Sequence, residues 1–405
     1  MLRAFFVSLL LLSMVSSHAG EFTGSLRVIP EYHHANQDSL FLVPKPFYEF
    51  HQRRSRQEFE GRYQNGGFNL LATAISTLEE NTKPDNELLL NELYYDTVMA
   101  EQELSFGKKI MSWGVGYGFR PLDVLQQENR QLIYSPTLEG VPLMDWEYFG
   151  DNTAFTLAYI NPLHGTDSDN LDEESLAFKY YYLWDNTDIH AIARLSRRNK
   201  GEVGIGFTNI VNDNLEWHGS FLYQHRYHKK LNRLIAEGSE LLASDNPMIE
   251  QFFHSGIKTL IGFTWSNSAG ISLLGEFWFD KAAYSETQWN QLRDLTLSQL
   301  QLIGKVPDSA IYNNVAANSQ FFSQANLLQQ NLFLRLSFDG DTVDGALDWL
   351  FTPQDGGWVL TASLSHESNQ QRFELGLRTF GGNSESAYRT ITADFISYFS
   401  WKIAL

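Results

Sequence analysis

The sequence predicts an all-β fold: a single transmembrane antiparallel β-barrel of about 18 strands, with helical segments in two long extracellular loops. Three observations lead to this prediction. The chain ends on an alternating apolar–polar segment, it begins with an export signal, and the connections between its candidate strands alternate between short and long. Strands with one apolar and one wet face are what a closed barrel needs in order to cross a bilayer.

The C-terminal segment alternates between apolar and polar side chains up to its last residue. Such a strand is ordinary in a soluble β-sandwich. At the end of an exported chain that holds many similar segments, it favours a strand whose apolar face meets lipid. The apolar face consists of Ile391, Ala393, Phe395, Phe399, Trp401, Ile403 and Leu405, and the polar face of Thr392, Asp394, Ser400 and Lys402.

The N-terminus resembles a secretory signal peptide. Arg3 supplies a positive start, residues 4–15 form an apolar stretch, and Ser17 and Ala19 are small residues where signal peptidase reads the chain. We therefore expect residues 1–19 to be a signal peptide, cleaved after Ala19. The alternative is an uncleaved anchor helix, which the lack of a stop-transfer pattern disfavours. No later run approaches the roughly 20 apolar residues of a transmembrane helix.

Composition narrows the class of protein further. The chain has 405 residues, no cysteine and a formal net charge of −18 at pH 7. Disulfides and thiolate metal sites are therefore excluded, and an acidic balance argues against a nucleic-acid partner. No linker or change of composition marks a domain boundary, so we expect residues 20–405 to form one domain. We expect no cofactor and no metal site.

The alternating segments recur along the whole chain. An even number of them places both chain ends on one side of a barrel, as in bacterial outer-membrane proteins. The candidate strands lie near 22–32, 48–63, 67–77, 87–98, 101–110, 144–149, 153–161, 174–184, 187–197, 202–211, 214–226, 256–266, 270–281, 328–338, 342–351, 357–366, 370–380 and 389–405.

Connection lengths assign the two rims. Tight hairpin turns rich in Asn, Asp and Gly, such as 65–67 and 212–214, alternate with connections that are free to be longer. Short periplasmic turns and long extracellular loops are the pattern of transmembrane barrels. A soluble sandwich has no reason to segregate its loops in this way. The longer connections are 33–47, 78–86, 111–143, 162–173, 227–255 and 282–327.

Two of these loops show helical spacing of apolar residues, at 231–242 and at 289–303. A helical loop could act as a lid or plug over a pore. It could equally be a cap that packs on neighbouring loops. Both interpretations stay open at the level of sequence.

The inner face of the predicted barrel is rich in arginine. Charges that alternate with apolar residues must face the lumen, because a charge facing hydrocarbon near the midplane costs about 2–4 kcal/mol. Barrel closure would bring segments 48–63 and 370–380 onto the same wall, where the arginines could form a positive track for anions. Alternatively, they pair with Glu58, Glu60 and Glu374 and stiffen the wall. The predicted pore-lining residues are Arg54, Arg56, Arg62, Arg335, Arg372 and Arg378.

The segment 107–123 is the most unusual part of the chain, with several glycines among aromatic residues. The residues that follow it are apolar for a loop in water. We therefore expect the loop at about 111–143 to fold into the barrel and narrow it; the alternative is an Ω-loop on the outer rim. The predicted constriction residues are Trp113, Tyr117, Arg120, Asp123, Glu128 and Arg130.

This segment also carries a resemblance. A glycine–lysine pair followed by Trp-Gly and Pro-Leu-Asp is similar to a signature in uncharacterised proteobacterial outer-membrane barrels near the alginate-export channels. The resemblance implies an 18-strand channel with an in-folded loop, and an arginine-lined lumen is similar to what polyuronate export would use. The long 227–255 and 282–327 loops and a terminal leucine in place of an aromatic residue depart from the pattern. The matching positions are Gly107, Lys108, Trp113, Gly114, Pro121 and Asp123.

These observations predict a porin-like outer-membrane channel for passive passage of a small or polymeric anionic solute. The alternative is a plugged receptor, adhesin or assembly protein that binds a partner through its long loops. An enzyme is not expected, because Glu216, His218 and Ser220 follow one another along one strand, about 7 Å apart, too far to form a nucleophile–base pair. The expected partners are outer-membrane lipids and lipopolysaccharide, the barrel-assembly machinery and an anionic solute.

Overall fold

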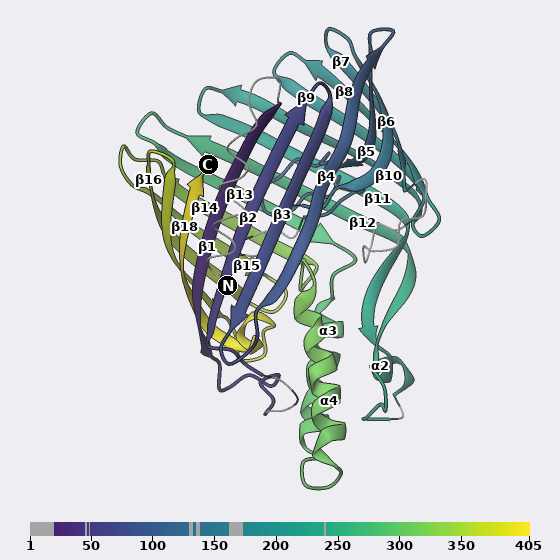
Figure 1. Ribbon diagram of the computed structural model, residues 1–405. Coiled ribbons are helices and arrows are strands. Elements are labelled where there is room, and N and C mark those ends of the chain that lie inside the picture. The colour runs from purple at the N-terminus through teal and green to yellow at the C-terminus, as the bar shows by residue number, and fades with distance from the viewer. Residues whose placement is uncertain are drawn as a thin grey trace.

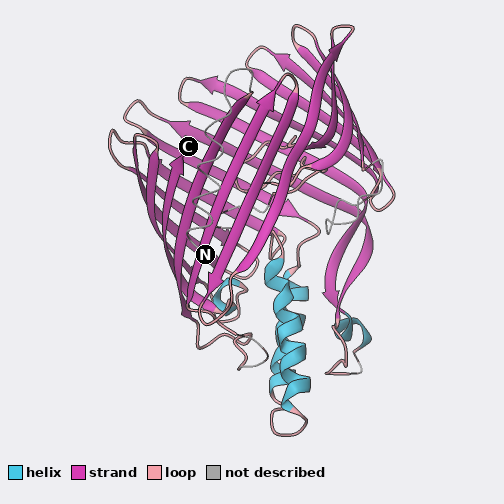
Figure 2. Ribbon diagram, viewed as in Figure 1, coloured by secondary structure: helices cyan, strands magenta, loops and turns pink. Residues whose placement is uncertain are grey.

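A computed structural model describes residues 20–405 except 45–46, 48, 129–132, 135–137, 162–172 and 239. One antiparallel sheet of 18 strands closes on itself, because β1 pairs with both β2 and β18 (Figures 1 and 2). The predicted signal peptide lies outside the described residues. The strands are β1 (Glu21–Ala35), β2 (Arg53–Asn65), β3 (Phe68–Glu79), β4 (Asp85–Met99), β5 (Gln102–Lys109), β6 (Val141–Phe149), β7 (Thr153–Ile160), β8 (Ser175–Trp184), β9 (Thr187–Ser196), β10 (Lys200–Asn212), β11 (Leu215–Asn232), β12 (Met248–Ser266), β13 (Ile271–Asp280), β14 (Gln330–Phe338), β15 (Asp344–Thr352), β16 (Gly357–Ser368), β17 (Gln371–Gly381) and β18 (Ala393–Ala404).

The predicted fold class is confirmed, and the helices lie in the two loops that showed helical spacing. These are α2 (Arg233–Glu237), followed by α3 (Glu286–Leu300), α4 (Asp308–Asn318) and the 3-10 helix η2 (Ser319–Ser323). A second 3-10 helix, η3 (Tyr388–Thr390), precedes β18. No helix in the described part of the chain is long and apolar enough to cross a membrane.

The largest difference from prediction concerns β11 and β12. The sequence placed a loop at 227–255, but the two strands stay paired from Leu215–Trp265 as far as Asn232–Met248. Their ends form a hairpin that projects beyond the barrel beside α3 and α4 (Figure 1). The sequence hides this extension because Lys229, Lys230, Glu250 and Gln251 interrupt its apolar residues, so it lacks the continuous apolar face of a membrane-spanning strand. A strand outside a bilayer does not need one.

Loop lengths separate the two rims of the barrel. The turns that follow every even-numbered strand from β2 to β16 are short, whereas the helices all lie in connections at the opposite rim. Both ends of the barrel sequence lie on the short-turn rim, where the Leu405 N–H donates to the Gly24 carbonyl at 2.8 Å. The long-loop rim therefore carries all the structure that could cover one end of the lumen.

The two faces of the sheet differ as a bilayer requires. Large apolar side chains stand exposed on the outer face, among them Leu364 and Leu375 at 61% exposure each. Charged side chains such as Arg194 and Glu276 are buried at 3% and 1% on the inner face. In β18 the odd-numbered face is the outer one, as predicted. Ile391, however, precedes the strand and packs against the apolar cluster formed around Trp289 and Phe321, which we call the long-loop cluster.

Two apolar clusters occupy part of the barrel interior. One joins the segment after β5 to the inner wall of β6–β11. The other joins the α3–η2 connection to the inner faces of β12–β16 and to the loops that flank β1 and β18. The lumen is thus partly filled from both sides.

Candidate functional site

The loop after β5 lies inside the barrel and is held in shape by one carboxylate. Asp123 Oδ1 accepts hydrogen bonds from the backbone N–H of Trp113 at 2.6 Å and of Gly114 at 2.5 Å, and Ser112 Oγ lies 3.1 Å away. Burial raises the pKa of the Asp123 carboxyl, while these donors and Arg120 act in the opposite direction. Position 114 must be glycine, because a Cβ there would come within 2.6 Å of the Arg120 Cβ.

One side of this loop packs on the inner wall of the barrel. The contact is apolar on both sides and excludes water, so it fixes the loop as a core would. The buried Arg194 on β9 adds a hydrogen bond from Nη1 to the Val124 carbonyl at 2.7 Å. The loop contributes Met111, Trp113, Leu122, Val124 and Leu125, and the wall contributes Val141, Leu143, Ala158, Ile160, Ala177, Ile192 and Leu222.

The same loop reaches the opposite part of the wall. The Glu276 carboxylate on β13 accepts the backbone N–H of Tyr117 at 2.5 Å and that of Gly118 at 2.7 Å. His218 Nε2 lies 2.9 Å from Glu276 Oε1. Gly262 makes this close approach feasible, since a Cβ there would lie 2.5 Å from the His218 ring and 2.7 Å from the Glu276 side chain.

Aromatic contacts continue the crossing. The Tyr117 ring stacks on Phe333 of β14 at 5.7 Å between centroids, and the Arg335 guanidinium lies 5.1 Å from the Tyr117 centroid. Further along the loop, the Tyr134 hydroxyl lies 3.2 Å from Glu374 of β17. The guanidinium of Arg27 on β1 lies 5.5 Å from the Tyr134 centroid. The described part of the loop therefore touches wall strands on both sides of the lumen.

A first cavity of about 390 Å³ remains between this loop and the wall of β14–β18. It is lined on the loop side by Tyr117 and Tyr134, and on the long-loop side by Gln324. Three guanidinium groups and two carboxylates face it, namely those of Arg335, Arg372, Arg378, Asp348 and Glu374. We call it the arginine cavity.

A second cavity of about 840 Å³ lies on the other side of the loop, against the wall of β9–β13. Gln324 lines it too, so the two cavities meet at this side chain. Its charges are mixed. Among its lining residues are Arg194, His228, Lys229, Lys230 and Lys258, together with Asp123, Glu202, Glu250 and Asp280. We call it the lysine cavity.

The six predicted arginines separate into two groups. Arg335, Arg372 and Arg378 line the arginine cavity, whereas Arg54, Arg56 and Arg62 lie on β2, which β18 and β1 separate from β17 along the same wall. Closure of the barrel therefore places both groups on adjoining parts of the wall, but only the first group lines the arginine cavity, and the β2 arginines line neither cavity. Of the acidic partners that the sequence suggested, Glu58 lies beside Arg56 and Glu374 beside Arg372.

Each arginine has a polar neighbour. Arg335 Nη1 lies 3.0 and 2.9 Å from the two Asp348 oxygens, and Arg378 Nε lies 2.8 Å from Thr361 Oγ1. The other four approach carboxylates at 2.7–3.9 Å. These pairs are Arg56–Glu58 at 2.7 Å, Arg62–Glu92 at 3.6 Å, Arg372–Glu374 at 3.7 Å and Arg54–Glu79 at 3.9 Å.

The predicted constriction residues differ in position. Tyr117 is 39% exposed and lines the arginine cavity, while Asp123 lines the lysine cavity although it is mostly buried. Trp113 is buried between loop and wall, so it anchors the loop and has no open face toward a solute. Arg120 bonds the Gly116 carbonyl, and Glu128 is half-buried. Arg130 lies outside the described residues.

Several residues that build this site were not singled out from the sequence. Glu276 is the most important, and its signal was present: it is a carboxylate in the middle of a mostly apolar strand, on the same inward face as Asp280. Gln324, Tyr134 and Phe333 carried no such signal, because their neighbours come from distant strands. Sequence patterns could assign a residue to one side of a strand, but they could not identify the residues that it contacts across the lumen.

Solved structures share this fold. The chain aligns with OccK8 (OprE) of Pseudomonas aeruginosa at a TM-score of 0.55 and 10% identity, covering 96% of this chain and 99% of that one. It aligns with OccK3 (OpdO) of the same organism at 0.53 and 9%, covering 95% and 96%. For OccAB1 of Acinetobacter baumannii the values are 0.52 and 7%, covering 97% and 98%. No family model and no curated protein matches the chain.

Proposed function

We propose that this protein is a porin-like channel of a Gram-negative outer membrane, which lets a small anionic solute pass passively and is narrowed by its own in-folded loop. One observation carries the proposal. The closed barrel retains two charged cavities that meet at Gln324, one on each side of the loop that crosses the lumen. A wall that served only as a scaffold would have no reason to keep charged space of this size.

The location follows from the outer face. A belt of exposed apolar side chains surrounds the barrel, and charged residues such as Arg335 and Glu276 point inward. This distribution is stable in a bilayer and would favour aggregation in water. The long loops with α3 and α4 would then face the outside and the short turns the periplasm. Insertion of such a barrel would depend on the barrel-assembly machinery.

The preference for anions rests on the arginine cavity. Three guanidinium groups face two carboxylates there, which leaves a positive excess. In a narrow, partly dehydrated space even one unbalanced charge attracts anions and repels cations. Tyr117 and Tyr134 border the same space and add aromatic surface.

A small solute agrees better with the lumen than a polymer does. The described residues of the loop after β5 divide the interior, and the arginine cavity measures about 390 Å³. Polyuronate export, which the resemblance of segment 107–123 would imply, needs a continuous wide path. We therefore assign the lower rank to a polymeric solute. We expect no catalytic activity, since the His218 ring lies between the Glu276 and Glu216 carboxylates and not beside a nucleophile.

A plugged receptor, adhesin or assembly protein is the second candidate, and the long-loop cluster favours it. Trp289 and Phe321 are stacked at 4.8 Å between centroids and fully buried, and Tyr284 is buried beside them. Loops that share a packed apolar core form a rigid surface, whereas a mobile lid would lack such a core. Its projecting helices would be the surface that a partner meets.

Planar-bilayer recording of the refolded mature protein separates the two candidates. Open steps with a reversal potential that favours anions under a salt gradient are expected for the channel. Silence from a folded barrel that still shifts on heating in a gel would overturn the channel and favour the plugged receptor. Open steps with cation selectivity would keep the channel and remove the anionic solute.

A further inference from the structure

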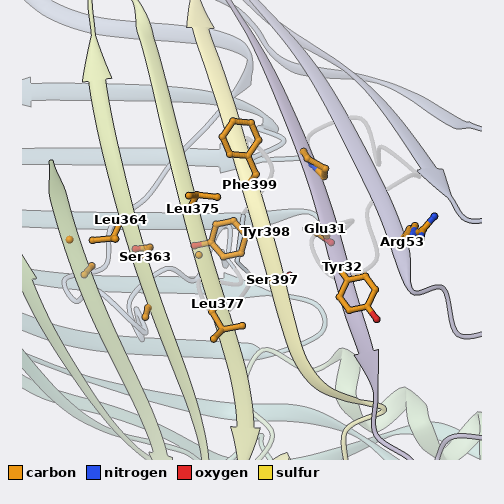
Figure 3. Close-up of a pocket in the computed structure, with 15 residues that line it drawn as sticks. Glu31, Tyr32, Arg53, Ser363, Leu364, Leu375, Leu377, Ser397, Tyr398 and Phe399 are labelled. Atoms are coloured by element: carbon orange, nitrogen blue, oxygen red, sulfur yellow. The ribbon is translucent and has the colours of Figure 1, made fainter. Parts of the chain in front are cut away.

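The outer wall of the barrel carries a groove at the seam where the sheet closes. The groove has a volume of about 900 Å³ and crosses β15, β16, β17, β18, β1 and the start of β2. Figure 3 shows its labelled side chains on neighbouring strands, from Leu364 on one side to Arg53 on the other. It lies on the lipid side of the wall, so it is distinct from the two cavities of the lumen.

The groove is hollow because small residues take the place of large ones on its floor. Gly345 and Ala362 are two of these on the outer face, while Leu364, Leu375 and Phe399 stand up at its sides with exposures of 61%, 61% and 37%. Elsewhere on the outer face, bulky residues such as Val203 stand out from the wall. A hollow with apolar sides in a lipid-facing wall suits a hydrocarbon chain.

The seam itself is interrupted at this place. Pairing of β1 with β18 runs from Ser25–Ala404 to Val28–Trp401 and resumes at Glu31–Tyr398. Pro30 lies in the gap and lines the groove. Proline has no N–H to donate, so it breaks the ladder where it occurs in a strand. An occupant that packs against this stretch would cover the least well bonded part of the closure.

The groove has a direction. Gly345 follows the short turn between β14 and β15, and Arg53 is the first residue of β2 at the long-loop rim. The groove therefore runs obliquely from near one membrane surface to the other. Arg53 points outward opposite Tyr32, and among the described residues no carboxylate pairs with its guanidinium. A cation at headgroup level above an apolar groove complements a lipid with a negative headgroup.

We propose that this groove binds one membrane lipid that carries a phosphate headgroup, with its acyl chain along Leu364, Leu375 and Phe399 and its phosphate at Arg53. The inference rests on the proposed position of the barrel in an outer membrane, with Arg53 at the outward-facing surface. The bound lipid would act as a seal over the closing seam of the sheet.

Native mass spectrometry of the detergent-released full barrel tests the proposal. The probe is an equimolar mixture of phosphatidylglycerol and phosphatidylcholine with identical myristoyl chains. The wild type is expected to retain one phosphatidylglycerol in preference to phosphatidylcholine. Arg53→Gln should reduce that preference about five-fold, the scale of one arginine near an anionic headgroup. It should still retain a lipid of either kind.

Filling the groove should abolish retention altogether. Gly345→Leu does this, since a Cβ at this position meets the Leu364 side chain at 3.3 Å, and Ala362→Phe does it on an exposed position. Val203→Phe, on the outer face of β10, is the matched control and should retain lipid like the wild type. The heat-dependent gel shift verifies that each variant is folded, and conductance reports separately on the proposed channel.

Three results would overturn the proposal. The first is equal retention of both lipids by the wild type, and the second is a preference for phosphatidylglycerol that Arg53→Gln leaves unchanged. Either result would show that Arg53 does not select the headgroup. A dimer or trimer mass that disappears in Gly345→Leu would show that a second copy of the chain covers the groove. None of these results would bear on whether the lumen conducts.

Discussion

Glu276 Oε1 lies 2.5 Å from the backbone nitrogen of Tyr117, a residue 159 positions earlier in the chain. The carboxylate is 1% exposed, and its second oxygen accepts the N–H of Gly118. One side chain of the wall thus holds the tip of the loop that crosses the lumen. We therefore expect the width of the proposed channel to depend on this contact.

Glu276→Ala should release the loop tip. It leaves two backbone donors without their acceptor, at a cost of about 1–3 kcal/mol for each buried unsatisfied group. Single-channel conductance should rise and become noisier as the tip moves. Glu276→Gln offers one acceptor oxygen in place of two and should give an intermediate result. Conductance identical to the wild type in both variants would show that the loop does not limit the path.

Arg378→Gln should weaken anion selectivity. The change removes one of three positive charges from the arginine cavity, and one charge at close range contributes roughly 1 kcal/mol in wet surroundings, or about five-fold in a permeability ratio. The reversal potential under a salt gradient measures it. Arg53→Gln is the control, because it removes the same charge from the outer face. A shift of equal size in both variants would contradict the assignment.

The pair Arg56→Gln and Arg335→Gln separates the two groups of arginines. Arg335 lines the arginine cavity, whereas Arg56 lies on β2 beside Glu58. We expect the reversal potential to respond more to Arg335→Gln. An equal response would mean that the β2 arginines also belong to the conducting path, as the sequence predicted.

Gln324→Trp should obstruct the junction of the two cavities. Its amide already bonds the Phe321 carbonyl at 3.1 Å, so the side chain is held in place between them. A bulkier side chain there is expected to lower conductance by a factor on the order of two or more. Gln320→Trp, on the same connection but outside both cavities, should conduct like the wild type. An unaffected Gln324→Trp channel would place the path elsewhere.

Asp123 should give the loop a pH dependence of definite sign. Burial raises the pKa of the Asp123 carboxyl in the folded protein. The folded protein is therefore less stable when this carboxyl is ionised than when it is protonated. Its stabilising contribution is fully present below the unfolded pKa and is lost as the pH rises through the folded pKa. The difference in stability between wild type and Asp123→Asn should therefore grow in favour of the wild type on acidification. Thermal unfolding in detergent across that range measures it.

Asp123→Ala is the comparison for this experiment. Asparagine keeps an oxygen that can accept the N–H groups of Trp113 and Gly114, whereas alanine keeps none. Alanine should therefore destabilise the loop at every pH by about 1–3 kcal/mol, seen as faster proteolysis. A pH-independent difference between wild type and Asp123→Asn would refute the burial argument.

Asn318→Ala should loosen the helical loop without opening the barrel. Asn318 is fully buried and bonds Thr296 and Gln299 of α3 at 2.9 Å, and it accepts the Asn232 amide at 2.7 Å. Loss of these three hydrogen bonds should lower the free energy of unfolding of the loop by about 1–3 kcal/mol and expose the α3–α4 connection to protease. Exposed Asn313→Ala on the same helix should behave like the wild type. Equal cleavage of the two variants would argue against a packed platform.

The sequence by itself determined the strands, their faces and the two rims. Period-two alternation is a local property, so Phe399 could be assigned outward and Arg335 inward without knowledge of any partner. Alternating loop lengths then fixed the order of strands around a closed sheet, since each hairpin pairs its own neighbours. The strands β11 and β12 were cut short in the prediction because charged and polar residues interrupt the apolar face of their projecting ends.

Only the tertiary structure decided what meets across the lumen and along the outer wall. The bond from Tyr117 to Glu276, the choice of Arg378 over Arg56 as a cavity residue, and the groove at Pro30 all depend on the register of closure. Register is a relation between segments far apart in the chain, and a face assignment carries no information about it. The sequence states which side of the wall a residue occupies, and the closed barrel decides which residue stands opposite.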